Sequence, residues 1–248
     1  MSGHSHWATI KHKKGAADAK RGKVFSKLVR AIMVAAKGGG DPAFNIRLRH
    51  SIDKAKAMRV PRDSIERAVK KGSGELPGQQ LDEITYEGYG PGGVALIIEV
   101  VTDNSNRTQP ELRKIFESAG GKLGSSGATA WMFKRKGLFG VSKEIEEDRL
   151  IEVALEAGAE DVQDVGSNWE ITCPAEDFDT VQKALAGAEI AMEVSELTFI
   201  ADNEIELDAE KQLRNLKLMD AIDEHDDVQS VYAAFTPDDA VIDSLADE

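Results

Sequence analysis

The pattern of apolar positions divides the first third of the chain into an irregular start and three helices. Residues 1–22 show no sustained apolar period, which is typical of an arm that becomes ordered only on a partner. From Lys23 the apolar residues recur at helical spacing, and the glycines at 38–40 end that pattern. Asp41 and Pro42 suit the cap and first turn of a second helix. Pro61 opens a third helix, which ends near Gly72.

The helical spacing also predicts which side chains of this bundle are buried. The first helix is expected to turn inward Phe25, Leu28, Val29, Ile32, Met33 and Ala36. The second is expected to bury Phe44, Leu48, Ile52, Ala55 and Met58, and the third Ile65, Ala68 and Val69. Three short amphipathic helices with a shared core and a basic exterior follow from this pattern.

After a polar linker at 73–82 the pattern changes to strands. Strands are predicted at 83–87 and 94–102, the second apolar nearly throughout and therefore central in its sheet. A helix over 107–119 turns Leu112, Ile115 and Phe116 inward, and 128–133 again has the pattern of a strand. A later helix at 208–225 and strand at 228–235 have no sheet of their own, so we expect them to join the sheet of 83–133.

The intervening segment, residues 134–203, has a separate order of predicted strands and helices. Strand 137–141, helix 144–157, strands 161–165 and 169–172, helix 175–185 and strand 191–199 follow in the ferredoxin-like order βαββαβ. We therefore predict an α+β protein with an N-terminal three-helix bundle and two α/β modules, the last ferredoxin-like and inserted in the middle one. The expected domains are an arm at 1–22, a bundle at 23–74, a discontinuous middle domain at 75–133 plus 204–248, and an insert at 134–203.

The charged residues also divide the chain into two parts, one basic and one acidic. Residues 1–74 hold 18 Lys and Arg against 5 Asp and Glu, a local charge of +13. Residues 75–248 hold 13 against 39, a charge of −26, so the overall charge of −13 conceals a basic module. Such a split indicates a module that attracts a polyanion, carried on a body that repels one.

The candidate nucleic-acid-binding residues come from the arm and from the third helix. In the arm, closely spaced cations can converge on phosphates, and two aromatic rings can stack on an unpaired base: Trp7, Lys11, His12, Lys13, Lys14, Lys20, Arg21 and Lys23. The alternative for the arm is a solvated tail with Trp7 folded back on the bundle. Near the turn between the second and third helices the candidates are Arg59, Arg62, Arg67, Lys70 and Lys71. That turn permits a helix-turn-helix interpretation, but the third helix carries no Asn or Gln to bind adenine, so sequence-specific recognition is weakly supported.

The sequence gives less support to cofactor binding, metal binding or catalysis. Gly88-x-Gly90-x-x-Gly93 matches a dinucleotide fingerprint only formally, because a strand follows it rather than a helix, and a hairpin connection is the better interpretation. His4 near the N-terminus could chelate copper or nickel adventitiously, and the single cysteine, Cys173, is expected to be a small core residue. We expect no cofactor, no metal and no catalysis. Without a secretory h-region or a run of about 20 apolar residues, we expect a cytoplasmic protein with no membrane partner, and a monomer.

Several motifs occur in a fixed order along nearly the whole chain. They are Gly3-His4-Ser5-x-Trp7, Ile10-Lys11-His12, Asp18-Ala19-Lys20-Arg21-Gly22-Lys23, Phe25-x-Lys27, Gly38-Gly39-Gly40-Asp41-Pro42, Tyr86-Glu87-Gly88-Tyr89-Gly90-Pro91-Gly92-Gly93, Asn106-Arg107-Thr108 and Asp226-Asp227-Val228-Gln229-x-Val231-Tyr232. In these motifs the chain resembles the YebC family. One departure is Arg59-Val60-Pro61, where the family usually has Asn-Met-Pro.

The resemblance implies a three-domain bacterial protein, classed as a probable transcriptional regulator that binds DNA. Related proteins, including mitochondrial ones, act in translation at the ribosome, and the family is not known for catalysis. Our first hypothesis is therefore a DNA-binding transcriptional regulator. The alternative is a ribosome-associated translation factor or translational activator that binds rRNA or tRNA. An enzyme that uses the loop at 88–93 is a third and unfavoured hypothesis, because no acid, base or nucleophile accompanies that loop.

Overall fold

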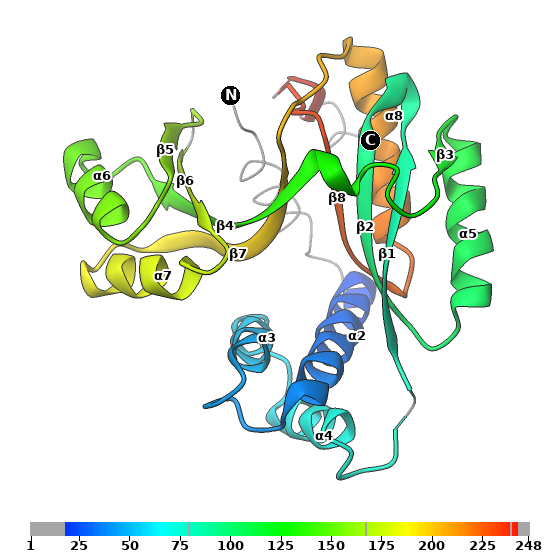
Figure 1. Ribbon diagram of the computed structural model, residues 1–248, viewed down its shortest axis with the longest axis horizontal. Helices are drawn as coiled ribbons and strands as arrows, with labels where there is room; N and C mark the ends of the chain where they lie inside the picture. Colours follow the sequence, from blue (N-terminus) through cyan, green and yellow to red (C-terminus); the bar gives the residue numbers. More distant parts are fainter. Residues whose placement is uncertain (1–17, 79, 167, 239, 243–248) are drawn as a thin grey trace. The chain divides into compact units, whose positions relative to one another are not determined.

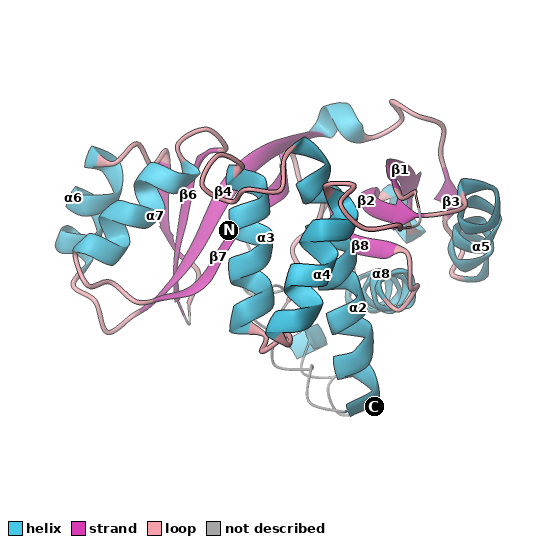
Figure 2. Cartoon of the chain, turned by 90° about the horizontal axis from the view of Figure 1, so that it is seen from below, coloured by secondary structure: helices cyan, strands magenta, loops and turns pink. Residues whose placement is uncertain are grey.

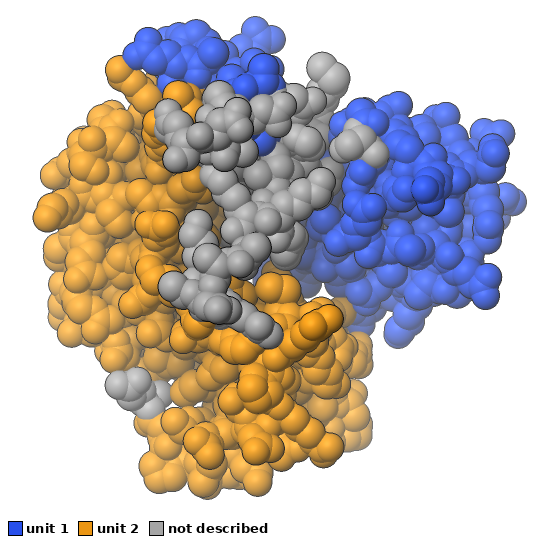
Figure 3. Space-filling view, turned by 180° about the vertical axis from the view of Figure 1, so that it is seen from behind, with its two compact units in different colours: residues 1–15, 131–212, 234–248 blue, residues 16–130, 213–233 orange. Residues whose placement is uncertain are grey.

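The structure is a computed structural model that describes residues 18–78, 80–166, 168–238 and 240–242, with side chains from Gly22 onward. The chain divides into two compact units, coloured separately in Figure 3. One unit comprises residues 16–130 and 213–233, and the other comprises residues 1–15, 131–212 and 234–248.

The first unit begins with the predicted helical bundle. Its helices are α2 (Asp18–Ala35), extended by the 3-10 turn η1 (Ala36–Gly38), then α3 (Ile46–Ala57) and α4 (Arg62–Gly72), and they lie together in Figure 2. They share one buried core, formed by Leu28, Ile32, Ala35, Ala36, Leu48, Ile52, Ala55, Val60, Ile65 and Ala68. A Cβ at Gly72 would lie 2.1 Å from the carbonyl oxygen of Met33, so glycine is what allows α4 to approach α2 this closely. The three-helix bundle is confirmed.

Two details of the predicted second helix are wrong. The helix starts at Ile46 rather than beside Pro42, because Asn45 and not Asp41 supplies the cap, accepting the N–H of Leu48 at 3.0 Å. Phe44 therefore lies in the preceding loop and is 91% exposed instead of buried. Met58 is also exposed, at 38%, because it follows the last helical residue and leaves the buried stripe.

The bundle is followed by an antiparallel sheet of four strands, in the order β3-β1-β2-β8 (Figure 1). The strands are β1 (Asp82–Tyr89), β2 (Ala95–Thr102), β3 (Lys122–Leu123) and β8 (Val228–Ala233). β2 is central and buried at every position but Glu99, as its apolar run predicts. β8 pairs with β2, with Val231 opposite Ile98, so the C-terminal strand joins this sheet as expected. The exact domain boundaries stay a prediction.

Helices and turns complete this unit. Helix α5 (Ser105–Ser118) follows β2, and the side chain of Asn104 caps it by accepting the N–H of Arg107 at 3.2 Å. Helix α8 (Ala209–Asp223) precedes β8. The 3-10 turn η2 (Pro91–Gly93) joins β1 to β2, which confirms a hairpin connection at the glycine-rich loop.

The strand predicted over 128–133 is wrong except at its last residue. Residues 130–132 form the 3-10 turn η3 (Ala130–Met132), and only Phe133 begins a strand. The reason is the buried carboxylate of Glu87, which accepts the N–H groups of Gly127, Thr129 and Ala130, each at 2.6 Å. These amides are bound to a carboxylate and are not available to a strand ladder.

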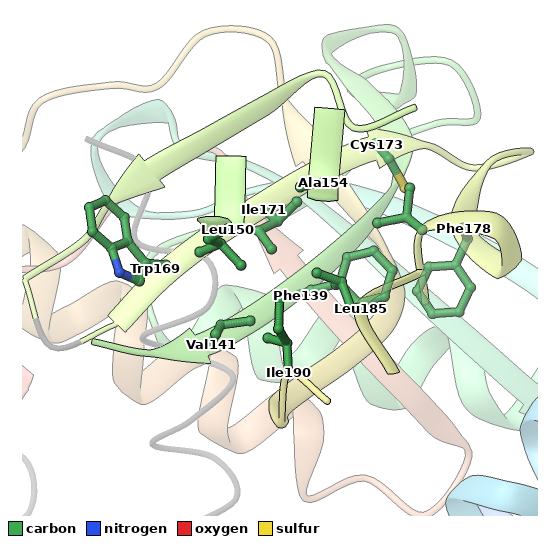
Figure 4. Close-up of a cluster of buried hydrophobic side chains, with 11 residues drawn as sticks. Phe139, Val141, Leu150, Ala154, Trp169, Ile171, Cys173, Phe178, Leu185 and Ile190 are labelled. Atoms are coloured by element: carbon green, nitrogen blue, oxygen red, sulfur yellow. The ribbon is translucent and has the colours of Figure 1, made fainter. Parts of the chain in front are cut away.

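The second unit has the ferredoxin-like order. Strand β4 (Phe133–Ser142), helix α6 (Glu147–Glu156), strands β5 (Asp161–Asp164) and β6 (Asn168–Pro174), helix α7 (Phe178–Gly187) and strand β7 (Met192–Ala201) follow one another. The antiparallel sheet runs β5-β6-β4-β7, which is the ferredoxin-like arrangement. Figure 4 shows its core, where the rings of Phe139 and Phe178 stack with centroids 4.9 Å apart. The α+β class with a ferredoxin-like insert is confirmed.

Candidate nucleic-acid interface

The arm residues fall outside what the structure describes. Trp7, Lys11, His12, Lys13 and Lys14 lie before residue 18, so their predicted role stays a prediction. Lys20 and Arg21 belong to the first turns of α2 by their backbone, and their side chains are not described. The described part of the candidate interface is therefore the rest of α2, together with α3, α4 and the turn between them.

The described cations of α2, from Lys23 onward, are directed toward acidic and carbonyl groups of the same unit. Lys23 donates to the carbonyl oxygen of Glu224 at 3.2 Å, and Lys27 lies 3.2 Å from the carboxylate of Asp223. Arg30 donates to the carboxylate of Asp227 at 3.1 Å. This face of α2 binds the segment after α8, which makes it a poorer phosphate ligand than the sequence suggested.

The turn between α3 and α4 contains an unusual backbone conformation. Arg59 has φ of 59°, in the left-handed region that glycine and asparagine tolerate best. Its N–H donates to the carbonyl of Lys56 at 2.9 Å, and the N–H of Val60 donates to the carbonyl of Ala55 at 2.9 Å. These two bonds form the Schellman motif that ends many helices, with arginine at the position usually held by glycine. The turn thus holds an arginine in a strained conformation and leaves its side chain exposed.

Helix α4 presents four of the five predicted bundle cations. Ile65 and Ala68 face the core, whereas Arg62, Arg67, Lys70 and Lys71 are exposed. Arg62 donates to Glu66 one turn later at 2.7 Å, and this hydrogen bond raises the pKa of the arginine. Within the described part of the chain, no ion pair engages Arg59, Arg67, Lys70 or Lys71. These four cations are available to an external anion.

An open groove lies between the loop before α3, helix α3 and helix α4. Its volume is about 730 Å³. Its apolar lining comes from Pro42, Ile52, Val60, Ile65 and Val69, and its charged lining from Lys56, Arg62, Lys70, Glu66 and Glu75. The apolar spacing of the helices predicted that most of this apolar lining, the floor of the groove, belongs to the core. That pattern did not indicate that the floor would be accessible from the solvent.

The other sequence candidates have structural roles. Gly90 packs against Asn215, whose amide donates to the carbonyl of Pro91 at 2.8 Å, so the hairpin turn is filled by protein. Cys173 is fully buried in β6, and burial raises the pKa of its thiol to about 11, which confirms a core residue. No group of three or more potential metal ligands occurs among the described residues. In the same part of the chain, no helix is long and apolar enough to cross a membrane.

The sequence patterns did not predict the structural roles of three residues of the first unit: Phe44, Arg30 and Asp227. Phe44 was expected in the core, and no pattern pointed to Arg30 or Asp227 as partners across 197 positions. A better signal for Phe44 was available in Asn45, which is itself a preferred helix cap and would have moved the helix start beyond the phenylalanine. The fold and this surface together define a class: an α+β protein with an N-terminal helical bundle whose last helix, with the turn before it, carries exposed cations that have no ion pair in the described chain.

Comparison with known proteins identifies the family within that class. Residues 5–75 match the model described as the TACO1/YebC protein N-terminal domain, and residues 81–235 match the TACO1/YebC second and third domain. The chain belongs to the TACO1/YebC family, which confirms the resemblance found in its sequence motifs.

Relatives cover the full length. A probable transcriptional regulatory protein of Desulforapulum autotrophicum is 51% identical over 99% of this chain and 100% of its own. Another of the same description, from Geobacter sulfurreducens, is 52% identical over 95% of this chain and 96% of its own. The crystal structure of a conserved hypothetical protein from Aquifex aeolicus superposes with a TM-score of 0.84 at 45% identity, covering 94% of this chain and 98% of that one.

The strained turn gives a direct test of the interface. Arg59→Gly should raise the free energy of unfolding of the bundle by about 0.5–1 kcal/mol, because glycine adopts positive φ without a Cβ clash. The same change should weaken nucleic-acid binding, because it removes an unpaired cation. Urea unfolding and a binding titration with labelled duplex DNA measure the two effects.

A matched control exists in the second unit. Glu189 also has φ of 59°, and the bond from the N–H of Ile190 to the carbonyl of Leu185, 2.9 Å, closes the same motif after α7. Glu189→Gly should stabilise its own unit and leave binding unchanged. Unchanged affinity in the Arg59 variant would mean that this arginine only closes the turn.

Proposed function

We propose that this protein regulates gene expression by binding nucleic acid through α4 and the turn before it, with duplex DNA as the target. The observation that carries the proposal is the contrast between two sets of cations. Lys23, Lys27 and Arg30 of α2 are engaged by carboxylates and carbonyls. Arg59, Arg67, Lys70 and Lys71 are exposed without an ion pair in the described chain. The names of the relatives support a regulatory role, and no catalytic step is part of the proposal.

The length of the connection between α3 and α4 is that of a helix-turn-helix motif. Four residues separate α3 from α4, a length that motif uses, and in it the second helix enters the major groove. Arg62 stands at the start of α4, where an arginine can contact guanine, but Glu66 already accepts its N–H. We therefore expect tight contact with phosphates and little discrimination between sequences. The arm residues Lys11, Lys13 and Lys14 would add further phosphate contacts.

A second candidate is a ribosome-associated translation factor that binds rRNA or tRNA. The specific observation in its favour is Phe44, 91% exposed on the basic bundle, because unpaired bases in structured RNA stack on aromatic side chains. Both candidates would act in the cytoplasm, with the protein as a monomer. They differ in the nucleic acid that binds more tightly.

The test is a paired titration of the full chain with duplex DNA and with ribosomes over a range of salt concentrations. If Arg59, Arg62, Arg67, Lys70 and Lys71 each neutralise one phosphate, the slope of log affinity against log salt on duplex DNA should be near −4.5. A slope near zero would contradict nucleic-acid binding by this surface. Ribosome association at salt concentrations that release duplex DNA would decide for the second candidate.

A further inference from the structure

Phe44 is the most exposed large apolar side chain of the described chain, at 91%, and it lies on the most basic part of the described chain. A single exposed hydrophobic residue needs no explanation by itself. Two further observations distinguish this one: the loop that carries it is held by a set of hydrogen bonds, and that loop forms one side of the groove beside α4.

The loop is fixed at both ends. The carboxylate of Asp41 accepts the N–H of Ala43 at 2.8 Å, and the carbonyl of Asp41 accepts the N–H groups of Phe44 at 3.2 Å and Asn45 at 3.0 Å. The amide of Asn45 donates to the carbonyls of Ala35 and Gly39, both at 2.8 Å, while its oxygen caps α3. The backbone of Phe44 is therefore held from both sides, and its ring is presented to solvent from a rigid support.

The groove next to this loop combines an apolar floor with a cationic edge. Pro42, two residues before Phe44, lines it together with Ile52 and Val69. Lys56, Arg62 and Lys70 stand around it. The side chains of Lys56 and Arg62 are 66% and 88% exposed, and they pair with Asp53 at 3.5 Å and Glu66 at 2.7 Å on their own helices. The two carboxylates present have partners, since Glu66 accepts from Arg62 and Glu75 accepts from Ser73 at 3.2 Å. About 730 Å³ falls within the range of roughly 300–1,000 Å³ typical of small-ligand sites.

We infer that Phe44 and this groove form a site for an unpaired nucleotide of RNA or single-stranded DNA, an inference that rests on the proposed nucleic-acid binding. The exposed ring offers a face on which a base can stack, and the apolar floor accommodates a base or sugar. Lys70, which has no ion pair within the described chain, neutralises an adjoining phosphate, and Lys56 and Arg62 can do so only by exchanging Asp53 and Glu66 for the phosphate. Charge complementarity decides the class of occupant. The bundle is strongly basic, so a polyanion is favoured, whereas the basic arm of the same chain would be repelled.

The experiment measures binding of the full chain to three labelled probes by fluorescence anisotropy: a 12-nucleotide oligo-U, a 12-nucleotide oligo-dT and a blunt DNA duplex. Phe44→Ala should weaken both single-stranded probes about tenfold, within the range measured for loss of one base–aromatic stack. Binding of the duplex should change by less than about twofold, because its bases are already stacked. Equal loss on all three probes, or no loss on any, overturns the inference.

Two replacements separate stacking from general apolar contact. Phe44→Trp keeps an aromatic face and should retain single-strand affinity, whereas Phe44→Leu keeps apolar area without that face and should behave like the alanine variant. Wild-type affinity in the leucine variant overturns the inference in favour of an apolar surface for a protein partner. The control is Leu155→Ala, which removes an exposed side chain, 49% exposed, from α6 of the other unit and should change nothing.

The salt dependence of affinity tests the phosphate contacts separately. Lys70→Ala should reduce the salt slope on oligo-U by about 0.7, the value for one phosphate contact on a single strand. An unchanged slope would remove Lys70 from the site. If the single-strand effects at Phe44 fail while the duplex still binds with a steep salt slope, only this inference is lost. If no probe binds, the proposed function itself is lost.

Discussion

Reversing three cations of α4 together, by Arg67→Glu, Lys70→Glu and Lys71→Glu, is expected to weaken duplex binding by roughly 500-fold at about 0.1 M salt. Loss of three phosphate contacts removes about 2.7 from the salt slope, which corresponds to that factor at this concentration. Repulsion between the new carboxylates and the phosphates would add to the loss. The measurement is a salt series of anisotropy titrations with wild type and variant.

Folding should survive this reversal. The core residues of α4, Ile65 and Ala68, are not changed. Acidic side chains in the last turn of a helix oppose its dipole by about 0.3–1 kcal/mol each, which is small compared with burial of the helix. Urea unfolding of the variant checks this directly.

The control carries the same change in net charge elsewhere. Arg113, Lys114 and Lys183 are exposed cations outside the bundle, on α5 and α7. Arg113→Glu, Lys114→Glu and Lys183→Glu together should leave affinity within about threefold, because none of these residues belongs to α4 or to the turn before it. Equal losses in both triple variants would assign the effect to net charge and refute a local interface on α4.

Asp227→Ala is expected to lower the free energy of unfolding by about 2–4 kcal/mol, because two buried threonine hydroxyls each lose a partner at a cost of about 1–3 kcal/mol. The carboxylate accepts from Arg107 at 2.8 Å, from Thr108 at 2.7 Å and from Thr102 at 3.0 Å on one oxygen, and from Arg30 at 3.1 Å on the other. Both threonines are fully buried, so their hydroxyl groups would lose a partner inside the protein.

The control is the adjacent carboxylate. Asp226 is exposed, and Arg30 binds its backbone carbonyl, which alanine retains. Asp226→Ala should change stability by less than about 0.5 kcal/mol. If the two variants were equally stable, the Asp227 cluster would not hold α2 to the sheet.

The stability from Asp227 should also depend on pH. Burial by itself raises the pKa of this carboxyl, but hydrogen bonds from Arg107, Thr108 and Thr102 together outweigh burial and leave the pKa below its usual 3.8. Because the folded pKa is depressed, the contribution is complete above the unfolded value near 3.9 and is lost as pH falls through the folded value. Urea unfolding at pH 7 and at about pH 3 should show the wild-type advantage over Asp227→Ala shrinking at the lower pH.

The sequence was informative wherever short-range patterns decide structure. Apolar period placed all three helices of the bundle, and the order of strands and helices was enough to predict the ferredoxin-like sheet, later found as β5-β6-β4-β7. The prediction from sequence failed where a polar group distant in the chain determines the local backbone structure. The carboxylate of Glu87 binds amides 40 to 43 residues away and turns a predicted strand into a 3-10 turn.

The candidate site shows the same division. Local charge density identified Arg59, Arg67, Lys70 and Lys71, which the structure leaves exposed, because a cation cluster on one helix is a local property. It could not show that Lys23, Lys27 and Arg30 would be engaged by residues near position 225, since that pairing depends on the closed sheet. The role of Phe44 depended on a cap shifted by four residues, from Asp41 to Asn45.

The pairing of β8 with β2 has a consequence for how the chain is made. The hydroxyl of Tyr232 on β8 donates to Glu99 on β2 at 2.9 Å, across 133 positions of sequence. At about 5–20 residues per second, a ribosome needs on the order of ten seconds to synthesise that interval. During this time β2, the most apolar strand of the first sheet, has a free edge of the kind that pairs with other chains. Chains released early, without residues 228–233, would keep that edge open, so aggregation should concentrate in truncated products and not in the finished protein.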